Sequence, residues 1–274
     1  MNFIFIILTF LISAVIARIL IPRILLISLR KKLFDIPDDR KIHKRAIPRL
    51  GGVSFFPTTL FAFCLVYAFR LLDGNSISTL YASYLLPELL LFACGMTLLY
   101  LTGIADDLVG VRYRQKFAIQ IFCACLFPLS GLWINDLYGL FGIHELSAYV
   151  GIPFTVLTVV FITNAINLID GIDGLASGLS SVALLVFTFL FISKGLWSYA
   201  MLSAGTFGVL VPFFYYNVFG SVERARKIFM GDTGSLTLGY TLSFLAIKYS
   251  QHNTDIMPYT CLLYTSPSPR DKRQ

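Results

Sequence analysis

Long apolar runs are the feature of this sequence that most constrains its fold. Eight of them are long enough to cross, or nearly cross, the roughly 30 Å hydrocarbon core of a bilayer. Backbone polar groups inside a bilayer need hydrogen-bond partners within the protein, and a helix supplies them within one segment. We therefore expect an all-α fold, a polytopic transmembrane bundle of about eight helices. The expected spans are residues 2–29, 51–71, 83–104, 117–134, 148–168, 178–193, 198–219 and 234–249.

The composition supports a membrane protein over the whole length. The chain is 57% hydrophobic and only 14% charged, against about 45–50% and about 25% in soluble domains. No stretch has the composition of a soluble domain, so we expect one transmembrane domain over residues 1–260. No histidines and cysteines stand at zinc-binding spacing.

The last residues depart from this pattern. Residues 261–274 read CLLYTSPSPRDKRQ, which is polar and proline-rich where an apolar run should continue. The string is similar to a translated sequencing-library adaptor, so we expect a non-native tail on a truncated chain. The alternative is a genuine polar tail.

Basic residues orient the bundle. They concentrate in the first, third and seventh connections: Arg30, Lys31, Lys32, Arg40, Lys41, Lys44, Arg45, Arg49; Arg112, Arg114, Lys116; and Arg224, Arg226, Lys227. The positive-inside rule then places the odd-numbered connections in the cytoplasm and the N-terminus outside. The net charge of +7 is thus one-sided. Because these residues lie in short loops at the membrane, nucleic acid is a poor partner.

This orientation puts five carboxylates on the cytoplasmic side. They open the third connection, occupy the fifth and close the seventh: Asp106, Asp107, Asp170, Asp173 and Asp232. Acids beside hydrocarbon are costly, and such residues are functional by default. The alternative is that these acids are ordinary solvated loop residues without a function.

The run NAINLIDGIDGL, residues 164–175, is the most informative local motif. On a helix, Asn164, Asn167, Asp170 and Asp173 would share one polar face, because they recur every third residue. The amides suit sugar or phosphate oxygens, and the paired acids need a cation or a proton between them.

A basic motif, DDRKIHKRAIPRLGG, occupies residues 38–52 and contains His43, Lys44 and Arg49. Cations beside a glycine turn suit phosphate through charge-assisted hydrogen bonds. A patch for anionic lipids is the alternative.

Two acidic motifs complete the pattern. Asp106 and Asp107 are adjacent at a helix end and so point in different directions; one could act as a base while the other supports a metal or a basic neighbour. In FMGDTGS, residues 229–235, a helix N-terminus that favours anions follows Asp232. A carboxylate there suits Mg²⁺, with Mn²⁺ as an alternative.

Together these motifs indicate phosphoryl transfer, in which a metal and cations align phosphates and neutralise developing charge. No Walker motif is present in the sequence, which argues against a P-loop hydrolase.

The four motifs, in this order and on this side, resemble the polyprenyl-phosphate N-acetylhexosamine-1-phosphate transferases (the WecA/MraY family), and HKRAIPRLGG looks like the WecA-type bacterial branch. The match covers residues 1–260. The resemblance implies transfer of N-acetylhexosamine-1-phosphate, with GlcNAc-1-phosphate expected, from a UDP-sugar to undecaprenyl phosphate, with release of UMP. It also implies a multi-pass protein of the bacterial inner membrane that starts lipid-linked glycans such as lipopolysaccharide O-antigen.

The resemblance assigns roles to particular residues. Asp232 would bind Mg²⁺, and Asp106 would contact or deprotonate the lipid phosphate with Asp107 beside it. Asp170 and Asp173 would lie in the nucleotide–metal site. The substrate-binding residues implied are Phe229 on uracil, Lys44 on a phosphate, and Asn167, Asn217, His43 and Arg49.

One departure from the family bears on activity. The family has ten to eleven helices and a histidine-bearing loop near its C-terminus, and neither the loop nor the last helices occur here. We therefore expect residues 1–274 to be inactive or nearly so.

Three alternatives stay open. They are a phospho-MurNAc-pentapeptide transferase of the same family, a proton-coupled transporter, and a non-catalytic lipid-binding scaffold. A transporter would place acids at the membrane midplane and carry inverted repeats, whereas these acids stand at loop ends without an internal repeat. The expected partners are the bilayer, the UDP-sugar and undecaprenyl phosphate, with a homodimer left open.

Overall fold

The computed structural model describes residues 2–31, 33, 48–73, 79–221 and 226–251. This part of the chain holds eight α-helices and no strand, and an isolated bridge joins Asp136 to Glu145. The α-helices are α1 (Asn2–Arg30), α2 (Phe55–Leu72), α3 (Thr79–Val109), α4 (Tyr113–Leu129), α5 (Ala148–Ile169), α6 (Leu175–Ser193), α7 (Trp197–Val218) and α8 (Gly231–Gln251). Two 3-10 helices, η1 (Leu50–Ser54) and η2 (Leu140–Gly142), join them. The predicted all-helical bundle is confirmed.

Most helix boundaries agree with the predicted spans within a few residues. The largest differences are at α3, which continues five residues past the predicted end to Val109, and at α4, which ends at Leu129 rather than residue 134. Pro128 and Gly131, whose φ is +87°, explain the earlier end of α4, because neither favours continuing a helix.

Six helices within the described residues are long and apolar enough to cross a membrane: α1, α2 with η1, α3, α5, α6 and α7. The chain is therefore a multi-pass membrane protein. The segments predicted at 117–134 and 234–249 do form helices, α4 and α8, but neither is among these six. Length and polarity explain this, because α4 has only 17 residues and α8 is rich in serine and threonine.

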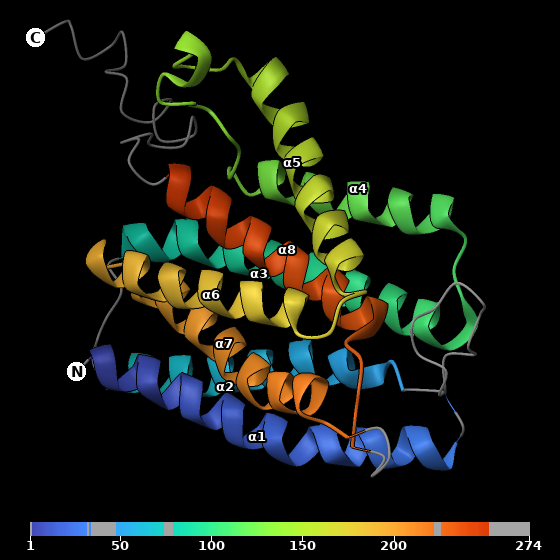
Figure 1. Cartoon of the computed structure of the whole chain (residues 1–274). Coiled ribbons are helices and arrows are strands. Elements are labelled where there is room, and N and C mark those ends of the chain that lie inside the picture. The colour runs from blue at the N-terminus through green and yellow to red at the C-terminus, as the bar shows by residue number, and fades with distance from the viewer. Residues whose placement is uncertain (1, 32, 34–47, 74–78, 222–225, 252–274) are drawn as a thin grey trace, which may run out of the picture.

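α8 is the central helix of the bundle and packs mainly on α3, α5 and α6 (Figure 1). Nearly every side chain from Thr233 to Leu245 is buried. Its hydroxyl groups are not left unpaired: Thr237, Thr241 and Ser243 each donate to the carbonyl four residues earlier. A polar helix can therefore occupy the middle of a membrane bundle, since its hydroxyls bond to its own backbone.

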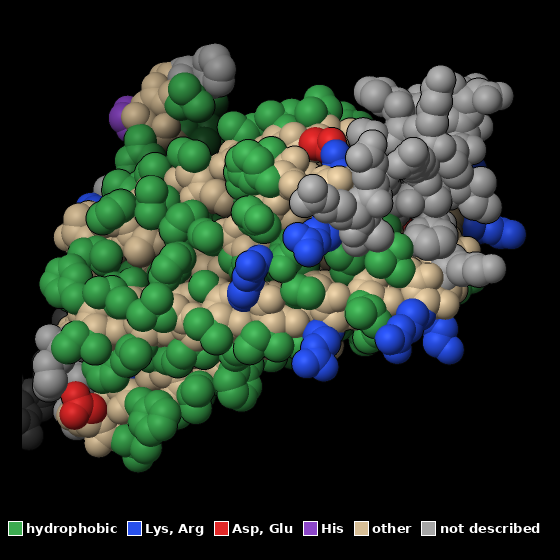
Figure 2. All heavy atoms as spheres, turned by 60° about the horizontal axis from the view of Figure 1, so that its bottom comes forward, with side chains coloured by type: hydrophobic (Ala, Val, Ile, Leu, Met, Phe, Trp, Pro, Cys, Tyr) green, Lys and Arg blue, Asp and Glu red, His purple; other side chains and the backbone are tan. Residues whose placement is uncertain are grey.

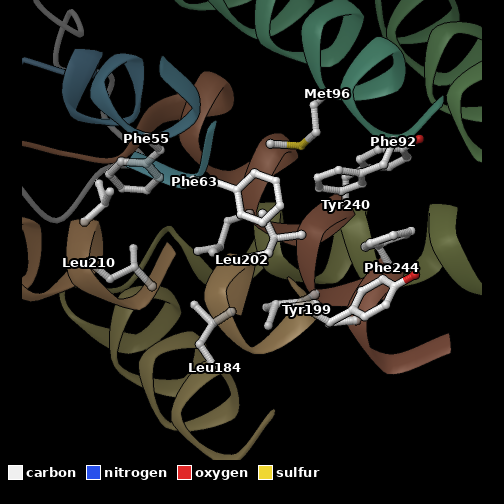
Figure 3. Packing of buried hydrophobic residues seen from close by; sticks show 14 of the residues in the cluster. Phe55, Phe63, Phe92, Met96, Leu184, Tyr199, Leu202, Leu210, Tyr240 and Phe244 are labelled. Carbon is white, nitrogen blue, oxygen red and sulfur yellow. The ribbon is translucent and has the colours of Figure 1, made fainter. Parts of the chain in front are cut away.

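Aromatic rings from α3 and α7 pack on α8 (Figure 3). Phe92 of α3 stacks on Tyr240 and Phe244, with ring centroids 5.6 and 4.4 Å apart. Tyr199 of α7 lies 5.9 Å from Phe244. Such pairs each add about 0.5–1.5 kcal/mol beyond their buried area. They fix the position of α8, and with it the residues at the helix N-terminus.

Candidate active site

The N-terminus of α8 is capped by a carboxylate from a distant helix. The first N–H groups of any helix lack intrahelical partners and carry positive partial charge. Here the N–H groups of Asp232 and Thr233 donate to Asp107 at the end of α3, over 2.8 and 2.9 Å. The Thr233 hydroxyl donates to the same carboxylate over 2.5 Å. Asp107 therefore joins α3 to α8.

A second carboxylate, from the end of α5, lies at the same place. Asp170 accepts a hydrogen bond from the Gly231 N–H. Burial, together with the carboxylates of Asp232 and Asp107, raises the pKa of Asp170 to about 8, although that hydrogen bond and Arg49 act in the opposite direction. The helix N-terminus was predicted to favour an anion, and the anions it holds are the protein's own carboxylates.

Glycines allow the backbones around this N-terminus to approach closely. A Cβ atom at Gly103 of α3 would lie 2.4 Å from the Thr233 Cα, and one at Gly52 of η1 would lie 2.2 Å from the Gly234 Cα. The Gly51 and Gly52 N–H groups donate to the carbonyls of Phe229 and Met230, over 2.9 and 2.8 Å. The glycine pair predicted to permit close backbone approach does so, against the protein's own chain.

Lys116, in the first turn of α4, connects the remaining acids. Its ammonium group donates to Asp106 over 2.8 Å and also contacts Asp232. The Asp232 carboxylate additionally accepts from the Asn167 amide over 2.5 Å, and its side chain keeps 25% of its surface exposed. Asp232 is thus held in place yet open to a ligand.

The adjacent acids Asp106 and Asp107 do point to different partners, as predicted from the sequence. Asp106 accepts from the Val111 N–H and from Lys116, whereas Asp107 caps α8. One acid is therefore beside a cation, and the other holds the helix.

The polar face predicted for residues 164–173 holds only as far as the helix continues. α5 ends at Ile169, so Asp170 and Asp173 lie in the turn that follows. Asp173 pairs there with Lys227, whose ammonium group lies 6.0 Å from the centre of the Phe229 ring. Lys227 therefore links Asp173 to the segment that carries Phe229, the residue that the family resemblance places on uracil.

Asn217 is in a different setting from the other predicted substrate-binding residues. It is buried in α7, and its amide accepts from the Gly174 N–H over 2.7 Å and donates to the Ile228 carbonyl over 3.0 Å. Asn217 thereby joins the turn after α5 to the segment that leads into α8. A substrate role for Asn217 stays a prediction.

Two predicted residues, His43 and Lys44, lie outside the described residues, as does the predicted tail over 261–274. Arg49 is described and acts electrostatically on Asp170.

Sequence reasoning used Lys116 and Lys227 only as loop charges and missed their pairing with the acids. A signal for Lys116 was available. A cation in the first turn of a helix opposes the helix dipole, and its position there indicates a partner elsewhere.

The carboxylates fit a divalent cation, although no three His, Cys, Asp or Glu side chains gather as a complete cage among the described residues. Mg²⁺ usually takes one or two carboxylates and completes its shell with waters and phosphates. The acids whose charges raise the pKa of Asp170 form a negative cluster that a cation would relieve. Asp232 is its accessible member.

An apolar groove leads away from this site between α2, α3, α7 and α8, with a volume of about 270 Å³. It begins at Phe55, whose ring lies 3.2 Å from the position of a Cβ on Gly234. Its wall on α3 belongs to a stripe at helical spacing that continues to the site: Leu89, Ala93, Met96, Tyr100, Gly103 and Asp107.

The fold and the site together define a multi-pass membrane protein with a carboxylate-rich polar site at one end of its helices. The chain belongs to glycosyl transferase family 4, whose model matches residues 89–250. The family resemblance drawn from the four motifs is thereby confirmed.

Individual relatives carry more specific names. A Bacillus subtilis (strain 168) protein named "Probable undecaprenyl-phosphate N-acetylglucosaminyl 1-phosphate transferase" is 32% identical over 243 residues, which are 88% of this chain and 62% of the relative. The undecaprenyl-phosphate alpha-N-acetylglucosaminyl 1-phosphate transferases of Yersinia pestis and Escherichia coli K12 are 29% and 30% identical over 239 residues, 86% and 84% of this chain. The chain spans 61% and 59% of their lengths, about three fifths.

Proposed function

We propose that the protein transfers GlcNAc-1-phosphate from UDP-GlcNAc to undecaprenyl phosphate and releases UMP. The observation that carries this proposal is the gathering of Asp106, Asp170 and Asp232 with Lys116 at one end of a membrane bundle. Membership in the family and the names of the relatives support the choice of donor and acceptor.

In this reaction an oxygen of the lipid phosphate forms a new bond to the phosphorus that carries the sugar. The bond from that phosphorus to UMP breaks, and UMP leaves with the electron pair. Asp106 would contact the lipid phosphate and take its proton, and Lys116 beside it would stabilise the negative charge that develops.

Asp232 would hold a Mg²⁺ ion, which neutralises and aligns phosphates when bound. Asp170 would support Asp232, because both lie at the same helix N-terminus. Phe229 would stack on the uracil, and Asp173, through Lys227, would fix the segment that carries Phe229.

The apolar groove suits the hydrocarbon chain of the acceptor. It starts beside the α8 N-terminus and follows α2 and α3 into the membrane-spanning part of the bundle. A polyprenyl phosphate could thus place its phosphate at the carboxylates and its first isoprene units along Phe55, Phe56 and Met96.

We also propose an inner-membrane location with the N-terminus outside, which the distribution of basic residues supports. A reporter enzyme active only outside the cytoplasm, fused after Lys194, should be active, and one fused after Lys227 should be inactive. The reverse result would overturn the orientation. A homodimer stays a prediction.

The main test measures binding beside turnover, because the chain spans about three fifths of the length of its relatives. Purified protein should bind UDP-GlcNAc in a Mg²⁺-dependent way, and membranes that carry it are assayed for UMP release that requires undecaprenyl phosphate. Asp232→Asn should weaken the Mg²⁺-dependent binding by roughly 10-fold or more, since charged hydrogen-bonding or ligating groups contribute about 1.5–3 kcal/mol. Asp136→Asn, at the other end of the bundle, is the matched control and should bind normally. Equal binding by wild type and Asp232→Asn, or binding without Mg²⁺, would refute the assignment.

A further inference from the structure

A second groove lies between α1 and α7 and has a volume of about 460 Å³. Next to this groove, small residues let α1 and α7 pack closely. A Cβ atom on Gly208 would lie 2.2 Å from the Ser13 hydroxyl oxygen, so the two helices nearly touch there. Beside this crossing the groove is lined by larger side chains, including Leu11, Val15 and Val211.

One charged side chain stands at one end of this otherwise apolar groove. Arg18 lines it, and its guanidinium group lies 5.4 and 5.2 Å from the ring centres of Tyr215 and Tyr216. It donates one hydrogen bond, over 2.9 Å, to the Tyr216 hydroxyl. The two rings orient the guanidinium through cation–π contact.

Arg18 lacks an acidic partner among the described residues, although it lies in a helix that can span a membrane. One of its five N–H donors is used within this part of the chain. An exposed arginine on a lipid-facing helix is costly, and such a residue usually has a partner or a functional reason.

The position of Arg18 along the bundle indicates what that partner is. Tyr215 is three residues, about 4.5 Å, from the end of α7 at Val218, the end at which Asn217 holds Gly174. From Arg18 the groove extends toward mid-membrane along α1 to Leu11, seven residues and about 10 Å away. A cation near the membrane boundary with an apolar channel behind it matches a phosphate headgroup with its hydrocarbon chain.

The surface around this groove is also divided into a basic part and an apolar part. Figure 2 shows Lys and Arg side chains gathered over one part of the face that α1 occupies, while the remainder is mostly hydrophobic. Basic pockets between membrane helices are typical binding places for anionic lipid headgroups.

We propose that the groove between α1 and α7 is a binding site for an anionic phospholipid of the surrounding bilayer, with the phosphate on Arg18 and one acyl chain along Val15 and Leu11. Arginine matches a phosphate with two parallel N–H donors. The volume is within the range that drug-sized ligands fill, which suits one acyl chain better than a long polyprenyl chain. The site is also separated from the carboxylates by α7, since Phe213 on its other face packs toward Gly51.

The test uses the whole chain in detergent, titrated with phosphatidylglycerol or with phosphatidylcholine of identical acyl chains, with bound lipids counted by native mass spectrometry. Phosphatidylglycerol should bind about 10-fold more tightly, and Arg18→Gln should remove most of that preference, because one charge-assisted pair is worth about tenfold or more. Arg23→Gln is the matched control: Arg23 is an exposed arginine on the same helix and lies outside the groove. It should keep the preference.

A second variant keeps the test independent of the Arg18 charge. Val15→Trp should fill the groove and weaken phosphatidylglycerol binding while Arg18 remains. The proposal is overturned if the lipid preference is absent in the wild type, if it survives both Arg18→Gln and Val15→Trp, or if Arg23→Gln abolishes it equally. Displacement of phosphatidylglycerol by equimolar undecaprenyl phosphate would overturn the choice of a phospholipid as occupant.

Discussion

At each end of α8 a lysine pairs with one or more carboxylates, but positive and negative charges balance at only one end. At the end farther along the chain, Lys248 of α8 donates to buried Glu88 of α3 over 2.7 Å, and the Tyr199 hydroxyl donates to the same carboxylate. At the N-terminal end, Lys116 pairs with Asp106 and Asp232 while Asp107 and Asp170 add further acids. A balanced pair holds helices together, whereas an excess of one charge leaves a place for a cation.

The largest effect should follow from breaking the balanced end. Glu88→Ala leaves the ammonium group of Lys248 partly buried without its acid, which typically costs about 3–5 kcal/mol. At roughly 2–4 °C per kcal/mol for a chain of this size, the midpoint of thermal unfolding should fall by about 10 °C. Mg²⁺ should not restore it. A fall of less than 2 °C in the unfolding midpoint would contradict a role for Glu88 in holding α3 and α8 together.

The next effect concerns the close approach at the acidic end. Gly103→Ala would place a methyl group 2.4 Å from the Thr233 Cα and should destabilise by about 1–3 kcal/mol, the usual cost of overpacking. It should also weaken Mg²⁺-dependent ligand binding, because Thr233 and Asp107 would separate. Gly178→Ala in α6 is the control, since its methyl group would meet Phe214 at an ordinary 3.4 Å. Equal unfolding midpoints for both variants would contradict the close packing.

Lys116→Met tests whether the excess acids at the site can accept a cation. Without Lys116, the like charges of Asp106 and Asp232 repel each other more strongly, and we expect a loss of about 1–2 kcal/mol in metal-free buffer. Mg²⁺ should recover most of that loss, unlike the loss in Glu88→Ala. The comparison is read from unfolding midpoints with and without the ion, and absence of a Mg²⁺ effect on Lys116→Met would count against a cation site.

The smallest effect depends on pH. The pKa of Asp170 is raised to about 8 in the fold from its ordinary value of 3.8, so ionised Asp170 is disfavoured in the folded state. Its charge therefore reduces stability progressively as pH rises from about 4 to about 8. Asp170→Asn should unfold a few °C above wild type at pH 9 in metal-free buffer, and the difference should shrink at pH 5. A variant that is less stable than wild type at pH 9 would refute the burial of this charge.

The sequence predicts the helices of this protein better than it predicts the contacts of its site residues. Apolar run length predicts the helices because membrane burial leaves the backbone few alternatives. The convergence of Asp106, Asp170 and Asp232 on one end followed from topology alone. Their individual partners could not be predicted: that Asp107 caps α8, or that Asn217 joins Gly174 to Ile228, depends on helix rotations that loop positions leave undetermined.

The helix end after Ile169 illustrates the same limit. The three-residue spacing of Asp170 and Asp173 favoured a common helical face, yet Gly174 has a φ of +74° and the chain turns before it. Periodicity describes a face only while the helix lasts, and a nearby glycine is the local sign that it ends.

The capping of α8 by Asp107 has a consequence for how the protein is made. The two residues of each capping bond are separated by 125 or 126 positions, and the acceptor is synthesised first. Since chains emerge from the N-terminus, α3 and α5 are already in the membrane when α8 arrives, and its first turn is completed by acids that precede it. The polar site is thus assembled in the same step that seats the central helix, so a chain whose α8 fails to insert has neither a closed bundle nor a formed site.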